Sequence, residues 1–183
     1  EKTSEMENNK VLDIGCGTGH HVDLLNKKGY QCVGIDKSKH MIEVAKKKYP
    51  KYNFSEEDAT KNITFDSNTF SLITCLYFTI YYIKNKSQFF ENCYKWLKPN
   101  GYLVIHLVNK HKFSPIINAG DPLLIISPQK YAEKRITNSV VDFNNFKYKA
   151  DFELNQSTGK FQEIFKFKNS NKVRQNDHIF HME

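Results

Sequence analysis

Three glycines at alternate positions, Gly15, Gly17 and Gly19, follow a short apolar run formed by Val11, Leu12 and Ile14. Such a run is typical of a buried parallel strand, and the glycines let the chain turn sharply and let a ligand approach the backbone without meeting a side chain. Beyond Gly19 the apolar residues recur at helical spacing, so a helix should begin at the turn. Because the N-terminus of such a helix favours nucleotide ligands, the stretch predicts a nucleotide-binding loop.

Two neighbours of the glycines argue against a dinucleotide as the ligand. The third glycine of a Gly-x-Gly-x-x-Gly pattern would fall at position 20, which is His20, so a nicotinamide-dependent oxidoreductase is disfavoured. Asp13 places a carboxylate where it would repel a pyrophosphate and favour a cationic ligand. Residues 11–19 resemble the first motif of the class I S-adenosylmethionine-dependent methyltransferases. That resemblance implies a Rossmann-like fold and S-adenosyl-L-methionine as the cofactor.

Two further acidic residues suit a nucleoside. Asp36 closes the apolar run 32–35 about 20 residues after the loop, a position from which a carboxylate can accept both ribose hydroxyls. The resemblance to the family implies that Asp58 and Ala59 border the adenine, with the acid accepting from the exocyclic amine; an acidic surface turn is the alternative. The expected cofactor-binding residues are Asp13, Gly15, Cys16, Gly17, Gly19, Asp36, Lys37, Met41, Asp58, Ala59, Cys75 and Leu76.

Aromatic residues follow the fourth predicted strand, at the edge where open α/β sheets bind ligands. They can face the sulfonium or the acceptor, or pack in the core: Tyr77, Phe78, Tyr81 and Tyr82. The sulfonium already activates its methyl group, so transfer needs alignment above all, and a base only where the acceptor loses a proton. The predicted catalytic residues are Tyr82 and His106, which ends the fifth strand and can instead be a merely hydrogen-bonded histidine. His20 and His21 are expected on the first helix, near the cofactor's carboxylate.

Alternating strands and helices are needed to bring these residues together. Buried strands are expected at 11–14, 32–36, 52–55, 70–76 and 102–108, with helices from 20 to near 29, from 39 to 49 and from 89 to 97. The Leu-Lys-Pro-Asn-Gly sequence at 97–101 is again similar to the methyltransferase family. The expected fold class is α/β, with a Rossmann-like doubly wound parallel sheet forming the cofactor-binding core over residues 1–109.

Residues 110–183 follow a different pattern. A long connection at 111–129 is expected to help form the acceptor pocket, and apolar and polar residues then alternate with period two. Strands are expected near 136–143, 146–155, 160–168 and 172–181, with a hairpin turn at 157–159. They would form an antiparallel sheet with one covered face, which carries Phe146, Tyr148, Phe152, Phe165 and Phe167.

Two interpretations of this antiparallel region stay open. It can be the helix and hairpin that normally complete the family's parallel sheet. It can also be a substrate-covering excursion, a lid, of the kind that some small-molecule methyltransferases insert after the fifth strand. We prefer the lid, packed over the carboxyl edge of the parallel sheet. On that interpretation the usual last strands lie beyond Glu183, and the sequence is truncated at both ends.

Composition limits the classes of function. The 183 residues suit one domain with a small appended subdomain, and no apolar run approaches the roughly 20 residues of a membrane span. The net charge of +7 comes from lysines spread along the chain, which indicates a solvated surface and disfavours nucleic acid as a partner. The four cysteines are scattered without a metal-binding pair, so we expect free buried thiols in a reducing cytoplasm.

The expected function is S-adenosylmethionine-dependent methyl transfer to a nitrogen or oxygen atom of a small-molecule acceptor, by a cytoplasmic transferase. One alternative is an RNA methyltransferase, which the basic charge favours but which the lack of an Asn-Pro-Pro-Tyr-like run disfavours. Another is a non-catalytic nucleotide-binding module with the same fold. The sequence names neither the acceptor nor the oligomeric state.

Overall fold

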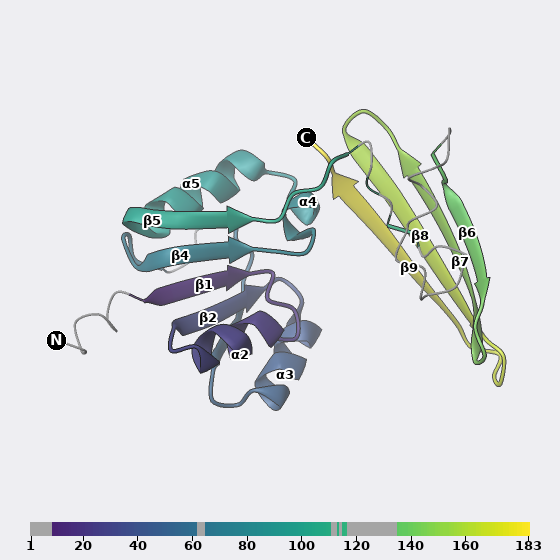
Figure 1. Ribbon diagram of the computed structural model, residues 1–183, viewed down its shortest axis with the longest axis horizontal. Coiled ribbons are helices and arrows are strands. Elements are labelled where there is room, and N and C mark those ends of the chain that lie inside the picture. The colour runs from purple at the N-terminus through teal and green to yellow at the C-terminus, as the bar shows by residue number, and fades with distance from the viewer. Residues whose placement is uncertain (1–8, 62–64, 111–112, 114, 117–134) are drawn as a thin grey trace. The chain divides into compact units, whose positions relative to one another are not determined.

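The computed structural model describes residues 9–61, 65–110, 113, 115–116 and 135–183. The chain divides into two compact units, Glu1–Leu107 and Val108–Glu183. Each unit has its own β-sheet, and among the described residues the two sheets share no strand (Figure 1). The fold is therefore α/β with an additional antiparallel β unit at the C-terminal end, as the sequence predicted. The expected connection at 111–129 lies largely outside the described residues.

The first unit contains a five-stranded sheet in which every neighbouring pair is parallel. The strand order is β3-β2-β1-β4-β5, and the bounds are β1 (Lys10–Ile14), β2 (Gln31–Asp36), β3 (Asn53–Glu56), β4 (Phe70–Cys75) and β5 (Leu97–Ile105). The apolar run of β1 is buried throughout, as a central parallel strand requires. This arrangement confirms the Rossmann-like prediction.

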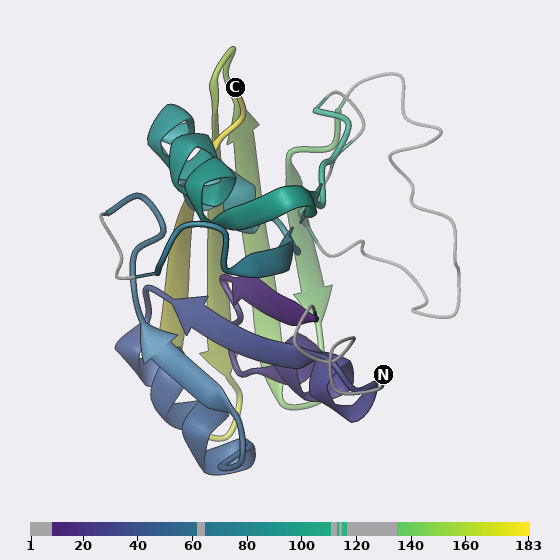
Figure 2. The ribbon, with the colours of Figure 1, turned by 90° about the vertical axis from the view of Figure 1, so that its left-hand side faces the viewer.

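Within the described part of this unit, four helices accompany the sheet: α2 (His20–Lys27), α3 (Lys39–Lys48), α4 (Thr79–Tyr82) and α5 (Lys86–Trp96). Figures 1 and 2 show α5 beside β5, with α2 and α3 at the other end of the sheet. From the central strand β1, the chain adds β2 and β3 on one side and β4 and β5 on the other. Because crossover connections between parallel strands are right-handed, α5 lies on the face of the sheet opposite to α2 and α3. Val22 of α2 and Ala45 of α3 are fully buried in one core with Val11 of β1.

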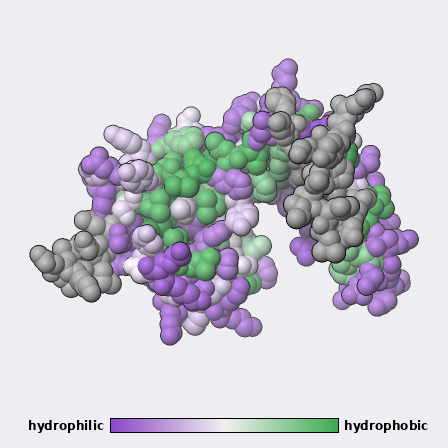
Figure 3. Space-filling view, viewed as in Figure 1, coloured by the Kyte–Doolittle hydropathy of each residue, from purple (hydrophilic) through white to green (hydrophobic). Residues whose placement is uncertain are grey.

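Strand β5 differs from its prediction at both ends. It begins at Leu97, because this residue already pairs with Phe70 of β4, and a bulge separates this pair from the next, Leu72 with Tyr102. The Lys-Pro-Asn-Gly turn is thus an irregularity inside the strand. The strand ends at Ile105, three residues earlier than expected. Figure 3 shows hydrophobic residues gathered over β4 and β5. Tyr102 of β5 is 72% exposed.

The second unit is a four-stranded antiparallel sheet of consecutive strands. Its strands are β6 (Asn138–Asp142), β7 (Phe146–Leu154), β8 (Thr158–Phe167) and β9 (Val173–His181), each within two residues of the predicted bounds. The hairpin turn between β7 and β8 lies slightly earlier than expected, because Leu154 pairs with Gly159. The strands therefore do not extend the parallel sheet, which confirms a separate antiparallel unit.

Register places the predicted aromatic residues on one face of this sheet. Phe146 pairs with Phe167 and Tyr148 with Phe165, so all four side chains stand on the same side. Tyr148 is fully buried, Phe146 and Phe165 are half-buried, and Phe167 is exposed near the end of the sheet. The face is thus covered toward one end and open at the other.

Candidate functional site

The carboxyl ends of β1 and β4 meet at the point where the strand order reverses. Ile14, the last residue of β1, lies opposite both Ile35 of β2 and Cys75 of β4. In open α/β sheets the crevice at such a switch point is where ligands bind. Successive strands are about 4.8 Å apart, so the ends of β2 and β4 are separated by roughly 10 Å, with the glycine loop between them.

All three loop glycines have positive φ angles, but they have different surroundings. A Cβ atom at Gly15 would lie 2.3 Å from Thr79 Cγ2, and one at Gly19 would lie 2.7 Å from the Phe54 ring. A Cβ atom at Gly17 (φ 53°) would meet nothing within 4 Å. Packing therefore requires Gly15 and Gly19, whereas Gly17 turns toward open space. A side chain at position 17 would fill the volume that a bound ligand needs.

Cys16 has a structural role in this loop. Its backbone N–H donates to the carbonyl of Ile35 at 3.0 Å, and its buried sulfur would lie 2.8 Å from a Cβ at Gly34. Burial, with a smaller contribution from Asp13, raises the pKa of the Cys16 thiol to about 12. The thiol is therefore not a nucleophile, and the backbone of Cys16, whose carbonyl accepts from the Gly19 N–H at 2.9 Å, holds the loop in shape.

Asp36 lies at the end of β2, beside the loop, as the sequence predicted. Its carboxylate accepts the Gly17 N–H at 2.9 Å and the Ser38 N–H at 2.8 Å, one on each oxygen. A carboxylate offers about four lone-pair positions, so both oxygens keep the capacity to accept a ribose hydroxyl. The same side chain thus holds the loop in place and remains available to a nucleoside.

The loop after β3 is joined to this group. Asp58 accepts both the N–H (3.0 Å) and the hydroxyl (2.7 Å) of Thr60, and Lys37 Nζ lies 3.4 Å from its other oxygen. Partial burial raises the pKa of Asp58, but these bonds and the nearby lysine outweigh it and hold that pKa below its ordinary value. Ala59 is buried, and its carbonyl accepts from the Asn92 side chain at 2.8 Å.

Asp13 is the most buried carboxylate of the crevice, with 1% of its surface exposed. Its Oδ1 accepts from the Thr74 hydroxyl at 2.7 Å. Its Oδ2 is buried with no hydrogen-bond partner among the described residues, and His21 Nδ1 lies 4.0 Å away. Burial raises the pKa of Asp13 above its ordinary value, which the bond from Thr74 only partly offsets. An unpartnered buried carboxylate oxygen suits a cationic group of a ligand.

Four rings gather at the end of β4. Phe78 stacks on His106 at a centroid distance of 5.7 Å, and Tyr77 meets the same imidazole edge-on at 6.1 Å. Tyr77 also stacks on His21 at 5.3 Å. The His106 N–H donates to the carbonyl of Cys75 at 3.1 Å, so the residue is held at the crevice with its surface exposed.

The remaining predicted residues line the same edge less directly. Cys75 is fully buried at the end of β4, and Leu76 follows it half-buried. Met41, in the first turn of α3, is 40% exposed, and Tyr82 ends α4 at 49% exposed. Lys37 is exposed and reaches the site through Asp58.

Sequence reasoning did not single out two polar side chains that organise the site, Thr74 and Asn92. Asn92 Nδ2 donates to the carbonyls of Ala59 and Lys61, so α5 fixes the loop that carries Asp58. A signal for it does exist in the sequence. Asn92 is an amide on the buried side of a helix between Phe89 and Trp96, where a polar group must find a partner.

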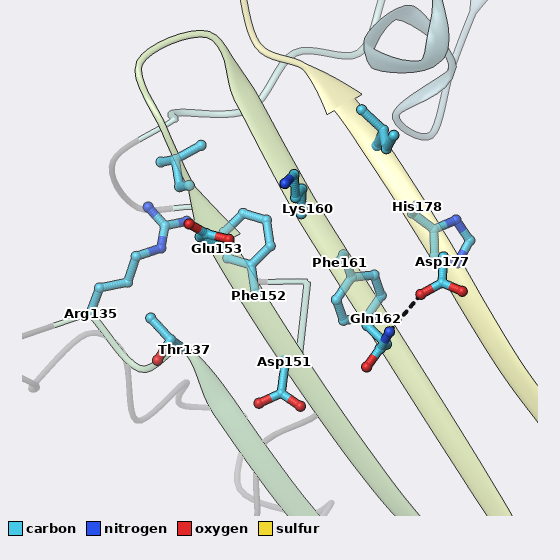
Figure 4. Close-up of a pocket in the computed structure, with 12 residues that line it drawn as sticks. Arg135, Thr137, Asp151, Phe152, Glu153, Lys160, Phe161, Gln162, Asp177 and His178 are labelled. Carbon is cyan, nitrogen blue, oxygen red and sulfur yellow. Dashed lines mark hydrogen bonds between the residues drawn. The ribbon is translucent and has the colours of Figure 1, made fainter.

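The second unit has a hollow of its own, with a volume of about 720 Å³. Figure 4 shows side chains from β7, β8 and β9 around it, together with Arg135 and Thr137 from the segment before β6, and Gln162 donates to Asp177 at 2.7 Å. The Arg135 guanidinium lies 4.8 Å from the centroid of the Phe152 ring. The residues that line this hollow all belong to the second unit, so it is separate from the crevice at the glycine loop.

A parallel sheet with a glycine loop and two strand-end carboxylates at its switch point defines an α/β protein that binds a nucleoside. The sequence profile of the family described as methyltransferase domain matches residues 12–105, just over half of the chain. The chain belongs to this family, within the class I S-adenosylmethionine-dependent methyltransferases, as residues 11–19 indicated.

Two curated relatives each match more than half of the chain. The phosphoethanolamine N-methyltransferase of Plasmodium falciparum is 37% identical over 103 residues, which are 54% of this chain and 39% of that protein. The ubiquinone biosynthesis O-methyltransferase of Coxiella burnetii is 29% identical over 115 residues, 61% of this chain and 48% of that protein. The chain thus spans less than half the length of these relatives.

Solved structures share the fold. A S-adenosylmethionine-dependent methyltransferase from Clostridium acetobutylicum has a TM-score of 0.71 at 18% identity, covering all of this chain and 69% of that one. The sugar N-methyltransferase KedS8 from Streptoalloteichus has a TM-score of 0.66 at 17% identity, covering 96% and 66%. Because these likenesses extend over nearly the whole chain, the antiparallel unit is part of the shared fold. Among the described residues, no helix is long and apolar enough to span a membrane.

Proposed function

We propose that the chain binds S-adenosyl-L-methionine in the crevice around the glycine loop and takes part in methyl transfer to a small-molecule acceptor. One observation carries this proposal. The loop leaves open space at Gly17, whose N–H donates to the Asp36 carboxylate. In addition, the buried Asp13 Oδ2 has no hydrogen-bond partner among the described residues and can accept from a cationic group. A ligand with a ribose at one end and an ammonium group at the other matches these two carboxylates.

The residues present fit this cofactor at three positions. Asp36 would accept the ribose hydroxyls, and Asp58, kept ionised by Thr60 and Lys37, would accept from the adenine amine. Asp13 and His21 would hold the amino-acid end. The bound sulfonium supplies a methyl group already activated for displacement. The task of the chain is then to fix the orientation and exclude water, a contribution of about 7–11 kcal/mol when the reacting atoms are well aligned.

The catalytic assignments concern the acceptor. His106 is held at the crevice by its backbone bond to Cys75, with its imidazole against Tyr77 and Phe78. In this proposal His106 acts as a general base for an acceptor that must lose a proton, which accelerates transfer by about 10²–10⁴-fold. Tyr82 is a second candidate for this role.

The class of acceptor is inferred from relatives. The two curated relatives are named for a phosphoethanolamine nitrogen and for an oxygen methylation in ubiquinone biosynthesis, and KedS8 for a sugar nitrogen. A nitrogen or oxygen atom of a small molecule is therefore the acceptor that we propose. Free buried cysteines, which form no disulfide among the described residues, support a reducing compartment such as the cytoplasm.

Calorimetric titration with S-adenosylmethionine, S-adenosylhomocysteine and NAD tests this function. We expect both adenosyl ligands to bind and NAD not to bind. Incubation with phosphoethanolamine and with amino sugars, followed by detection of S-adenosylhomocysteine, then tests transfer. Binding of NAD alone would reject the proposal, and binding of the adenosyl ligands without any transfer to a wide acceptor panel would favour a non-catalytic module.

A further inference from the structure

Tyr77 adopts a backbone conformation that its residue type disfavours. Its φ angle is 45° and that of Phe78 is 62°, so two bulky aromatic residues in succession lie in the left-handed region. Large side chains at positive φ are genuine outliers, and glycine or asparagine would adopt the same conformation with less strain. Such strain persists only where the surroundings impose it, and it concentrates at functional sites.

Core packing does not account for the position of the Tyr77 ring. The residue is 67% exposed, whereas Phe78 beside it is half-buried and stacks on His106. Tyr77 therefore recovers little of its strain through burial of its own ring. The local contacts of that ring are with two imidazoles, His21 at 5.3 Å and His106 at 6.1 Å.

These contacts place Tyr77 between two parts of the crevice. His21 belongs to α2, which begins at the glycine loop, and its Nδ1 lies 4.0 Å from the unpartnered Asp13 Oδ2. His106 follows β5 on the other side and is the proposed base. The ring thus stands between the carboxylate that suits a cationic ligand and the imidazole that suits an acceptor, which is where a transferred group must pass.

We propose that Tyr77 presents its ring to the sulfonium of S-adenosylmethionine and so distinguishes this cation from its neutral product. The inference rests on the proposed function and deepens it. An aromatic ring attracts a cation through its quadrupole, and it gains nothing comparable from a thioether. The strained backbone is the means by which the ring is kept at this point of the crevice and out of the core.

The test compares the affinities of S-adenosylmethionine and S-adenosylhomocysteine by calorimetry for the parent and three variants. In Tyr77→Gly we expect S-adenosylmethionine to bind about 2- to 30-fold more weakly, the range of a cation–π contact, and S-adenosylhomocysteine to change less than about 2-fold. Tyr77→Phe keeps the ring and should keep the parent ratio. Asn100→Gly, at a left-handed position (φ 63°) inside β5, is the matched control and should change neither affinity.

Thermal unfolding separates this role from a structural one. Because glycine relieves the left-handed strain, Tyr77→Gly should keep the parent Tm within about 2 °C; a drop well beyond that would mark a structural residue and overturn the proposal. An equal loss for both ligands, or no loss for either, would also overturn it while leaving the proposed function standing. A parent protein that binds neither ligand would refute both.

Discussion

At the scale of single residues, the crevice depends on carboxylates that are placed in opposite electrostatic environments. Asp58 is held ionised by Thr60 and Lys37, whereas Asp13 is buried with one oxygen unpartnered. Asp36, at the end of β2, accepts one backbone N–H on each oxygen. Asp13 and Asp58 therefore respond differently to pH, because their pKa values are shifted in opposite directions.

Asp36→Ala should weaken S-adenosylhomocysteine binding at least about tenfold, because each lost charge-assisted hydrogen bond contributes roughly 1.5–3 kcal/mol. The substitution also removes the bond to the Gly17 N–H, so affinity alone does not locate the ribose. A 2′-deoxy analogue resolves this point. The parent should bind this analogue clearly more weakly than S-adenosylhomocysteine, and the ratio of the two affinities should be closer to one for Asp36→Ala. An equal ratio for both proteins would show that Asp36 does not bind the ribose.

Binding of the cationic cofactor should release a proton from Asp13. Burial raises the pKa of this carboxyl above its ordinary value of 3.8, so above pH 3.8 the folded protein holds a proton that the unfolded chain loses. Stability conferred by this group therefore falls as pH rises through that window. A cation beside Oδ2 favours the carboxylate and lowers the pKa again.

The measurement is titration of S-adenosylmethionine at a series of pH values above 3.8, each in two buffers of different ionisation enthalpy. The heat should depend on the buffer for the parent and lose that dependence in Asp13→Asn, which keeps an acceptor for Thr74. His21→Gln, which removes the neighbouring titratable ring, should retain the dependence. Loss of the dependence in His21→Gln alone would assign the proton to the imidazole instead.

At the scale of elements, the glycine loop and the strand ends that flank it decide whether a ligand can enter. Gly17→Ala should abolish cofactor binding, because the added Cβ points into space that is empty of protein atoms and that the ligand would occupy. Gly29→Ala is the matched control, since Gly29 also has a positive φ and open space around a Cβ but lies beyond α2. Both variants should lose about 1 kcal/mol of unfolding free energy, because each places a side chain at a left-handed position. Calorimetry should nevertheless show parent-like affinity for the cofactor in Gly29→Ala and no binding in Gly17→Ala. Equal affinities would show that the ligand does not approach the loop backbone.

Much of this element arrangement could be predicted from sequence. Continuous apolar runs marked β1, β2 and β4, and strict alternation marked β7 and β8, because these periodicities follow directly from burial on both faces or on one. The start of β5 was missed, since a bulge kept Leu97 paired through what looked like a plain turn. The bond from Thr74 to Asp13 spans 61 residues and depends on strand register, which no local pattern reports. The left-handed backbone of Tyr77 could not be foreseen, because its residue type argues against it.

At the scale of the whole molecule, the two units carry different spectroscopic probes. The single tryptophan of the sequence, Trp96, is buried in the first unit, and so are all four cysteines. Burial raises the pKa of the Cys75 and Cys93 thiols to about 12, so these groups should not react with alkylating agents at neutral pH while the unit is folded.

Saturating S-adenosylhomocysteine should raise the midpoint of the Trp96 fluorescence transition and delay thiol labelling to the same temperature. At about one hundred times Kd the stabilisation is about 2.7 kcal/mol, since the ligand binds the folded unit alone. Heating with and without ligand, followed by fluorescence and by mass spectrometry of alkylated cysteines, measures both. The Gly17→Ala variant should show no shift. Thiols that react well below the fluorescence midpoint would contradict the buried placement.

The order of strands in the two sheets also has a kinetic consequence. In the antiparallel unit every strand pairs with its neighbour in sequence, so its contacts are local and form quickly. In the parallel sheet the pairing of β1 with β4 forms more slowly, because Val11 pairs with Leu72, which lies far along the chain. A ribosome nevertheless delivers the slowly assembling unit first. The crevice, which exists only once β1 and β4 lie side by side, is thus among the last features of its unit to form, and an adenosyl ligand present during synthesis would select chains that have completed it.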